Sequence, residues 1–174
     1  MQDIKVGSFT GTGAALNVEI GFAPKAFLCF NITDGDIFQM WFEGMASGTA
    51  FQGANHDSKQ FSLESSNGIS TYAGEAPDKT LTGTLSFTSG SASVSGSSTS
   101  FLTELKAGDT IKTAGGKEYV VASIASAASL TLSSAATATE SGVNAVRRNG
   151  RAPGVTVGTT MSESGKTIRY VAFR

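Results

Sequence analysis

Residues 84–105, TLSFTSGSASVSGSSTSFLTEL, consist mostly of serine, threonine and glycine, a composition typical of a flexible linker. Apolar residues nevertheless alternate with polar ones, as Leu85 and Phe87 do before a Ser-Gly turn and Ala92 and Val94 do after it. Disordered tracts lack apolar residues spaced in this way. We therefore expect this stretch to form strands whose serine and threonine side chains face solvent.

The chain that follows continues the pattern of short strands. DTIKTAGGKEYVVASI predicts a hairpin with a two-residue Gly-Gly loop that pairs Ile111 with Val120 and places Ala122 and Ile124 on the same face. FLTEL, residues 101–105, predicts one short helical turn that closes an end of the resulting structure. The middle of the chain is thus expected to be a small β domain.

The domain organisation follows from the segments on either side of this small domain. Both flanks are rich in β-formers separated by Gly, Pro, Asn and Asp, and we find no long segment of helical period. We therefore expect an all-β chain in which a jelly-roll-like β-sandwich, residues 1–79 plus 147–174, carries an inserted small barrel or sandwich, residues 80–146. A domain as small as the insert buries little surface and is marginally stable alone.

Several segments of the larger domain have clear strand patterns. ALNVEIGF places Leu16, Val18 and Ile20 on one face of a half-buried strand. AFLCFNI, residues 26–32, is apolar on both faces, which predicts a strand in the middle of the sandwich. An Asp-Gly turn then leads into IFQMWFEGM, and KTIRYVAFR forms a final strand near the end of the chain.

The charge of the chain is small but unevenly distributed. The formal net charge is −1, which gives no reason to expect nucleic acid or an anionic membrane as a partner. Residues 1–79 hold four lysines and nine carboxylates, whereas residues 147–174 hold six basic residues and one carboxylate. We expect the two ends to meet in space and the partners to be proteins. The start of the chain does not have the pattern of a secretory signal, so we do not expect export.

Two sets of phrases resemble structural proteins of tailed bacteriophages. One set is VGSFTGTGAALNVEIGFAPKAFLCFNITDG, WFEGM, GISTYAG and PGVTVGTTMSESGKTIRYVAFR; the other is SVSGSSTSFLTELKAGDTI and YVVASIASAASLTLS. The second set is similar to a small β module that recurs in phage head and tail proteins. The resemblance implies a virion protein, made in the bacterial cytoplasm, whose partner is the major capsid protein or another virion protein.

Few residues suggest chemistry. His56 lies in GANHDSKQF without a nucleophile elbow, and Cys29 lies in an apolar strand where a buried structural thiol is expected. GTGAAL lacks the third glycine of a dinucleotide fingerprint. Asp34 and Asp36 could offer oxygen ligands to Ca²⁺, but a plain turn is the better interpretation. We expect no catalytic site, cofactor or metal.

Two clusters are candidates for partner contacts. Arg147, Arg148 and Arg151 could bind an acidic patch on another protein, or they could lie in a solvated loop at the edge of the insert. The other cluster contains apolar residues that could anchor an interface, although core packing is the better interpretation: Trp41, Phe42 and Met45.

The resemblance and the composition together lead to one functional hypothesis. We expect a non-enzymatic capsid decoration or cement protein that binds the assembled head and stabilises it. A homo-oligomer is expected, and a trimer is one closed form that it could take. The alternatives are a tail, neck or fibre component, and a carbohydrate-binding module in which Trp41 or Tyr72 stacks on a sugar ring.

Overall fold

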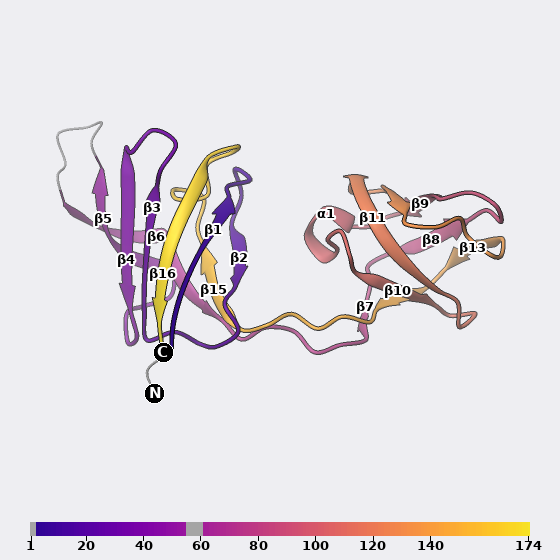
Figure 1. Ribbon diagram of the computed structural model, residues 1–174, viewed down its shortest axis with the longest axis horizontal. Coiled ribbons are helices and arrows are strands. Elements are labelled where there is room, and N and C mark those ends of the chain that lie inside the picture. Colours follow the sequence, from indigo (N-terminus) through magenta and orange to yellow (C-terminus); the bar gives the residue numbers. More distant parts are fainter. Residues whose placement is uncertain (1–2, 55–60) are drawn as a thin grey trace. The chain divides into compact units, whose positions relative to one another are not determined.

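The computed structural model of the chain describes residues 3–54 and 61–174, whose regular secondary structure is β-strand apart from one short helix (Figure 1). The expected all-β fold is therefore confirmed. The chain folds into two units, Met1–Gly74 with Ala152–Arg174, and Glu75–Arg151. We call the first the sandwich unit and the second the inserted module.

The sandwich unit is built from a single antiparallel sheet of eight strands in the order β1-β16-β3-β4-β5-β6-β15-β2. These strands are β1 (Ile4–Thr10), β2 (Leu16–Glu19), β3 (Ala26–Asn31), β4 (Ile37–Phe42), β5 (Thr49–Ala54), β6 (Ser62–Tyr72), β15 (Gly154–Val157) and β16 (Thr167–Phe173).

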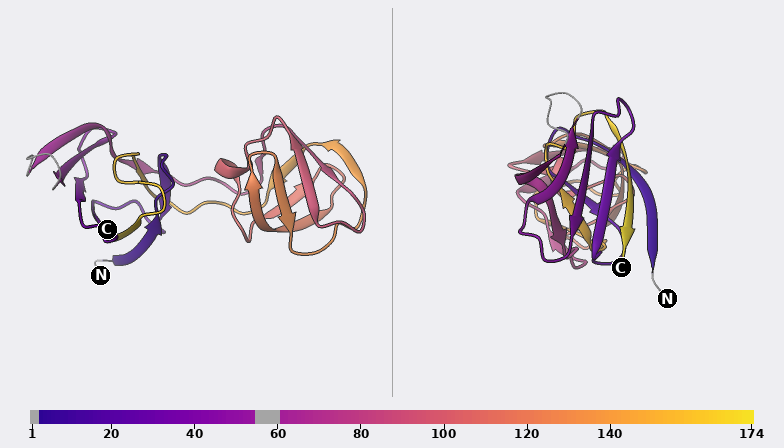
Figure 2. Two further views of the ribbon diagram at one scale, coloured as in Figure 1. Left: turned by 90° about the horizontal axis from the view of Figure 1, so that it is seen from above. Right: turned by 90° about the vertical axis from the view of Figure 1, so that its left-hand side faces the viewer.

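The sheet curls so that its two halves face each other across a common core (Figure 2). β6 makes the bend, because its first residues pair with β5 and its last residues pair with β15. The ammonium group of Lys5 on β1 donates a 2.6 Å hydrogen bond to the carbonyl of Ile20, just after β2. The two edge strands of the sheet are thereby linked by a side chain, and the result is sandwich-like.

Alternating residues of the strands fill the core of the sandwich unit. Val18 and Ile20 are buried as the sequence pattern predicts, and so are Ile168, Tyr170 and Ala172 of the last strand. The acidic beginning and the basic end of the chain also meet as expected. β1 pairs with β16 along its whole length, and the Arg174 guanidinium lies 2.8 Å from the Asp3 carboxylate.

The inserted module occupies the loop of a β-hairpin. β6 and β15 are antiparallel neighbours, with Ile69 opposite Val157 and Tyr72 opposite Gly154. The chain leaves the sandwich unit after Gly74 and returns at Ala152. An insertion between two adjacent antiparallel strands leaves every strand of the host sheet intact.

The boundaries of the module lie five residues further out on each side than residues 80–146. β7 (Lys79–Thr80) and β14 (Ala145–Arg147) pair with each other inside the module. Further out, Glu75 and Arg151 exchange backbone hydrogen bonds of 3.0 and 2.8 Å. The two crossing segments are therefore held together before either one enters the sandwich unit.

The serine-rich stretch forms strands and the helical turn of the module, not a linker. The module's other elements are β8 (Thr84–Phe87), β9 (Ser93–Ser97), α1 (Phe101–Glu104), β10 (Thr110–Thr113), β11 (Glu118–Ser126), β12 (Ser129–Leu132) and β13 (Glu140–Val143). Leu85, Phe87, Val94 and Phe101 are at most 2 % exposed, so they form the module's core while the serines remain outside.

The predicted register of the β10–β11 hairpin is wrong by one residue. Ile111 pairs with Tyr119, not Val120, because the connection is a longer turn in which the Gly116 N–H donates to the carbonyl of Thr113. Since side chains alternate, a slip of one residue reverses the faces. Tyr119 and Val121 are therefore buried, and Val120 is exposed.

Candidate functional site

The sandwich sheet has a second apolar face, on the side away from its core. Strand register places one apolar residue from each of six neighbouring strands in a continuous row. In order from β1 to β6 the row is Val6, Val171, Leu28, Met40, Phe51 and Leu63.

Two shorter rows flank the central row and complete this face. Toward one end of the strands the neighbours are Ile4, Phe173, Ala26 and Phe42. Toward the other end they are Ser8, Arg169, Phe30, Phe38 and Gly53. We call the three rows together the outer apolar face, and Arg169 is the one charged residue in these rows.

Large parts of the outer apolar face are exposed. Val6 is 64 % exposed, Leu63 58 % and Phe51 49 %, and Ile4, Phe30 and Phe42 are exposed as well. Monomeric proteins rarely expose contiguous apolar patches larger than a few hundred Å². The sequence predicts that residues 26–32 form a strand in the middle of the sandwich. In the structure only one face of this strand is covered by the chain itself.

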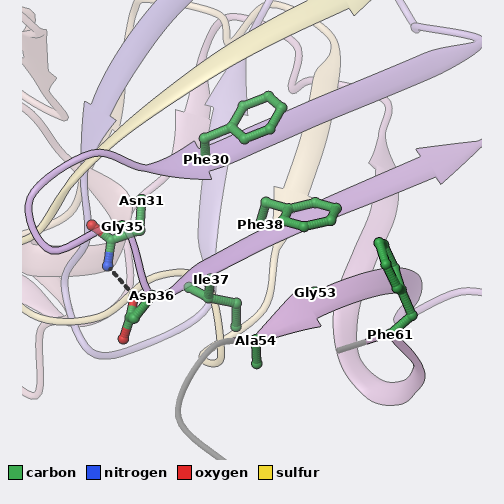
Figure 3. A pocket seen from close by; sticks show the side chains of 9 residues that line it. All are labelled: Phe30, Asn31, Gly35, Asp36, Ile37, Phe38, Gly53, Ala54 and Phe61. Carbon is green, nitrogen blue, oxygen red and sulfur yellow. Dashed lines mark hydrogen bonds between the residues drawn. The ribbon is translucent and has the colours of Figure 1, made fainter. Parts of the chain in front are cut away.

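An aromatic cluster lies at one end of the face (Figure 3). The ring centres of Phe30 and Phe38 are 5.8 Å apart, and those of Phe38 and Phe61 are 5.9 Å apart. The Phe38 ring covers Gly53, where an added Cβ would lie 2.1 Å from a ring carbon. Together with Ile37 the rings line an open hollow of about 470 Å³.

Three carboxylates gather beside this end of the sheet. Asp34, Asp36 and Glu163 have oxygens within 4.8 Å of one another. Asn31 donates to Asp36 at 2.9 Å and to Glu163 at 3.5 Å, and Lys166 forms an ion pair with Asp34. The hydrogen bond from Lys166 holds the pKa of Asp34 below its ordinary value. Each of these carboxylates therefore has a hydrogen-bond donor or an ion-pair partner within the chain.

Strand alternation separates the residues of the predicted apolar contact cluster. Trp41 is 2 % exposed and belongs to the core, whereas Phe42 is 43 % exposed and belongs to the outer apolar face. Met45 is partly buried, and its sulfur accepts a 3.3 Å hydrogen bond from the Phe42 N–H. Only Phe42 of this cluster is well placed for a partner, and Trp41 is not available to stack on a sugar.

Arg147 is buried in the inserted module, where its guanidinium binds other groups of the module. Its side chain is 1 % exposed and donates to the Glu75 carboxylate at 2.6 Å, to the Asn149 carbonyl at 2.7 Å and to the Glu104 carbonyl at 2.9 Å. The guanidinium thus joins the segment that enters the module to the helical turn and to the segment that leaves it.

The other two arginines of the predicted cluster also pair with carboxylates of the module. Arg151 is 9 % exposed and donates to both oxygens of Asp109, at 2.7 and 2.6 Å. Arg148 is 41 % exposed and contacts Asp78 and Glu118. The three arginines therefore hold the two end segments of the module in place, and Arg147 and Arg151 present little surface to a partner.

These ion pairs make the stability of the module depend on pH. Burial raises the pKa of Asp109, but hydrogen bonds from Arg151 and from the Lys106 N–H outweigh it, so the pKa lies below the ordinary 3.8. Burial likewise raises the pKa of Glu75, and Lys79 and Arg147 bring it below the ordinary 4.5. A carboxyl with a lowered pKa in the folded state stabilises that state above its unfolded pKa, and this contribution is lost as pH falls further.

We expect the urea midpoint of the module to be constant above about pH 5 and to fall steadily below about pH 4. Urea unfolding of the module at several pH values measures this. Asp109→Asn should lower the midpoint at neutral pH and flatten its decline in acid. A midpoint that is unchanged between neutral and strongly acidic solution would contradict the role given to these carboxylates.

Two of the remaining sequence candidates have structural surroundings in the part of the chain that the structure describes. Cys29 is fully buried, and burial raises the pKa of its thiol to about 12. Gly11 of GTGAAL packs against the backbone of Glu163, where an added Cβ would lie 2.0 Å from the carbonyl oxygen. His56 lies outside the described residues. Among the residues that are described, no helix is long and apolar enough to cross a bilayer.

Sequence reasoning missed most of the outer apolar face, because its members come from six strands spread over the chain. The pairing of β1 with β16 brings in Val6, and the pairing of β5 with β6 brings in Leu63. The signal that was present was the apolarity of β3 on both faces. No protein-family model, curated protein or solved structure matches the chain.

Proposed function

We propose that this chain is a non-enzymatic structural protein of a tailed-bacteriophage virion, and specifically a decoration protein that binds the assembled capsid and stabilises it. The observation that carries the proposal is the outer apolar face, because an exposed apolar patch of this kind is typical of a surface that contacts other protein. The resemblance of both units to phage structural proteins supports the choice of the virion.

The proposed mechanism is mechanical. A rigid protein that binds the assembled shell, but not the separate capsid subunits, adds its binding free energy to the shell alone. The shell then loses subunits less readily on heating. The curled sheet suits this role, because strand pairing holds its backbone across all eight strands, from edge strand β1 to edge strand β2. Binding therefore does not carry the entropy cost of ordering this backbone.

The inserted module contributes a surface of a different kind. Its strands β8, β9 and β12 turn serine and threonine side chains outward while Leu85, Val94 and Leu130 face its core. A polar surface of this kind suits hydrated contacts with neighbouring subunits. The ion pairs of its three arginines tie the two ends of the module to each other and to its interior.

The test is binding to shells. Purified chain is mixed with mature empty capsids of the phage whose genome encodes it, co-sedimentation is measured, and capsid melting is followed by calorimetry. We expect saturable binding and a rise in the melting temperature of the shell. Unassembled capsid subunits are the control and should bind weakly. If the chain does not co-sediment with the capsids and does not shift their melting temperature, the proposal is refuted.

A further inference from the structure

We infer that a second copy of this chain covers the outer apolar face, so that the working unit is a face-to-face dimer. The inference rests on the proposed function, since it names the first partner of a subunit that works in an assembly. Three properties of the face support the inference: its area, its charge, and its position on one side of one sheet, which limits the assembly to two copies.

The area of the face suits a dimer. An aromatic side chain offers about 150–250 Å² of surface. Three of the six most exposed residues of the face are phenylalanines and three are smaller aliphatic residues, so the lower part of this range, about 150–200 Å², is the appropriate scale. With their exposed fractions of 40–64 % it gives roughly 500–600 Å², and the partly buried members of the face add to it. A standard interface buries about 800 Å² on each partner, so one copy of the face is close to what a stable dimer needs.

The charge of the face favours an identical partner. The central row contains no charged residue, and Arg169 lies in an end row beside Ser8. Two copies placed face to face therefore bury no carboxylate or ammonium in the middle of the interface, which avoids the desolvation of an unpaired charge. A membrane surface attracts faces that carry several basic residues, and this face has one.

The position of the face predicts two copies. All three rows lie on one side of one sheet, so together they form one patch on each copy. A patch that binds the same patch on another copy is an isologous contact, and it closes at two subunits. Sheets packed in this way lie about 10 Å apart and interdigitate their side chains, as Phe51 and Leu63 can do here.

The experiment is sedimentation equilibrium on the full chain. We expect the wild type to have twice the chain mass of 17.8 kDa at high concentration. In the variant Phe51→Glu with Leu63→Glu two charges would be buried, so it should be a monomer. The matched control is Leu102→Glu, because Leu102 is 62 % exposed but lies in the inserted module. This control should remain a dimer.

Folding of the face variants is checked by Trp41 fluorescence and that of the Leu102→Glu control by circular dichroism. The milder Phe51→Ser with Leu63→Ser replaces the glutamate variant if that one unfolds. Loss of the dimer in a folded face variant, with the dimer kept in the control, supports the inference. A wild type that is monomeric at every concentration overturns it, as does a folded face variant that stays dimeric. Wild type that floats with phosphatidylcholine vesicles as a monomer also overturns it.

Capsid binding separates this inference from the proposed function. A wild-type monomer that still binds capsids and raises their melting temperature overturns the dimer and leaves the decoration role standing. A dimer that binds no capsid does the reverse.

Discussion

Replacing Arg147 by methionine is expected to unfold the inserted module and to leave the sandwich unit folded. The substitution removes the donors that Glu75, Glu104 and Asn149 share, and methionine fills much of the same space without replacing them. Glu75 is 26 % exposed and keeps its ion pair with Lys79, so the main loss is that of hydrogen bonds from a charged donor, each of which contributes about 1.5–3 kcal/mol. Domains are stable by roughly 0.05–0.15 kcal/mol per residue, so this loss is a large part of what a module of this size has.

The chain carries a convenient probe for this experiment. Trp41 is the single tryptophan and lies in the core of the sandwich unit, so its fluorescence follows that unit alone. Urea unfolding followed by both circular dichroism and Trp41 fluorescence should show an early transition in the first signal and an unchanged midpoint in the second.

The matched control is Arg148→Met. Arg148 is the next residue and also pairs with carboxylates, but its side chain is 41 % exposed, and exposed ion pairs contribute about 0–1 kcal/mol. The control should therefore unfold almost as the wild type does. Equal effects of the two substitutions would show that the module does not depend on this buried arginine. A shift of the Trp41 midpoint by Arg147→Met would show that the effect of the substitution is not confined to the module.

Deleting residues 75–151 and joining Gly74 to Ala152 is expected to leave a folded sandwich unit. The pair of Tyr72 and Gly154 then becomes the end of an ordinary hairpin, with a loop of Ala73, Gly74, Ala152 and Pro153. Hairpin loops of four residues are common, and Gly74 already has a positive φ of 79°. Shortening the connection also lowers the entropy cost of closing it.

The readout is again urea unfolding followed by Trp41 fluorescence. We expect a cooperative transition within about 1 kcal/mol of the corresponding transition of the full chain, since surface changes away from the core have small effects. The control is the excised fragment of residues 75–151, which should fold alone because Glu75 and Arg151 bridge its ends. A deletion variant whose Trp41 emission is that of an unfolded chain would refute the hairpin insertion.

The alternation of apolar residues predicted much of the fold. Leu85 and Phe87, and likewise Ile168 and Tyr170, face a core because a strand turns every second side chain to the same side. The hairpin at Gly116 was predicted one residue out of register, because sequence alone does not distinguish a two-residue loop from a longer turn when two glycines are adjacent.

The arginine cluster shows why nearness in sequence is a poor guide to a site. Arg147 and Arg148 are adjacent, yet the strand turns the first into the module and the second to its surface. The partners of these residues lie far away in the sequence, Glu75 being 72 residues from Arg147 and Asp109 42 residues from Arg151. Such pairs cannot be predicted without the topology.

The apolar strand of residues 26–32 shows a different limit. Leu28 and Phe30 on one face and Phe27 and Cys29 on the other predict that both faces are covered, as in a strand inside the sandwich. The physical requirement to remove apolar surface from water is the same whether the cover is part of the chain or another molecule. Only the structure shows which face lacks an internal cover.

The most direct test of the account is whether protein covers the outer apolar face. Hydroxyl-radical footprinting of the full chain over a dilution series, read by mass spectrometry, measures the exposure of Phe42, Phe51 and Leu63. We predict that these residues are protected at high concentration and become oxidised on dilution, while the exposed Leu102 of the inserted module is oxidised equally throughout. Oxidation of the face at the same rate as Leu102 at every concentration would contradict the account.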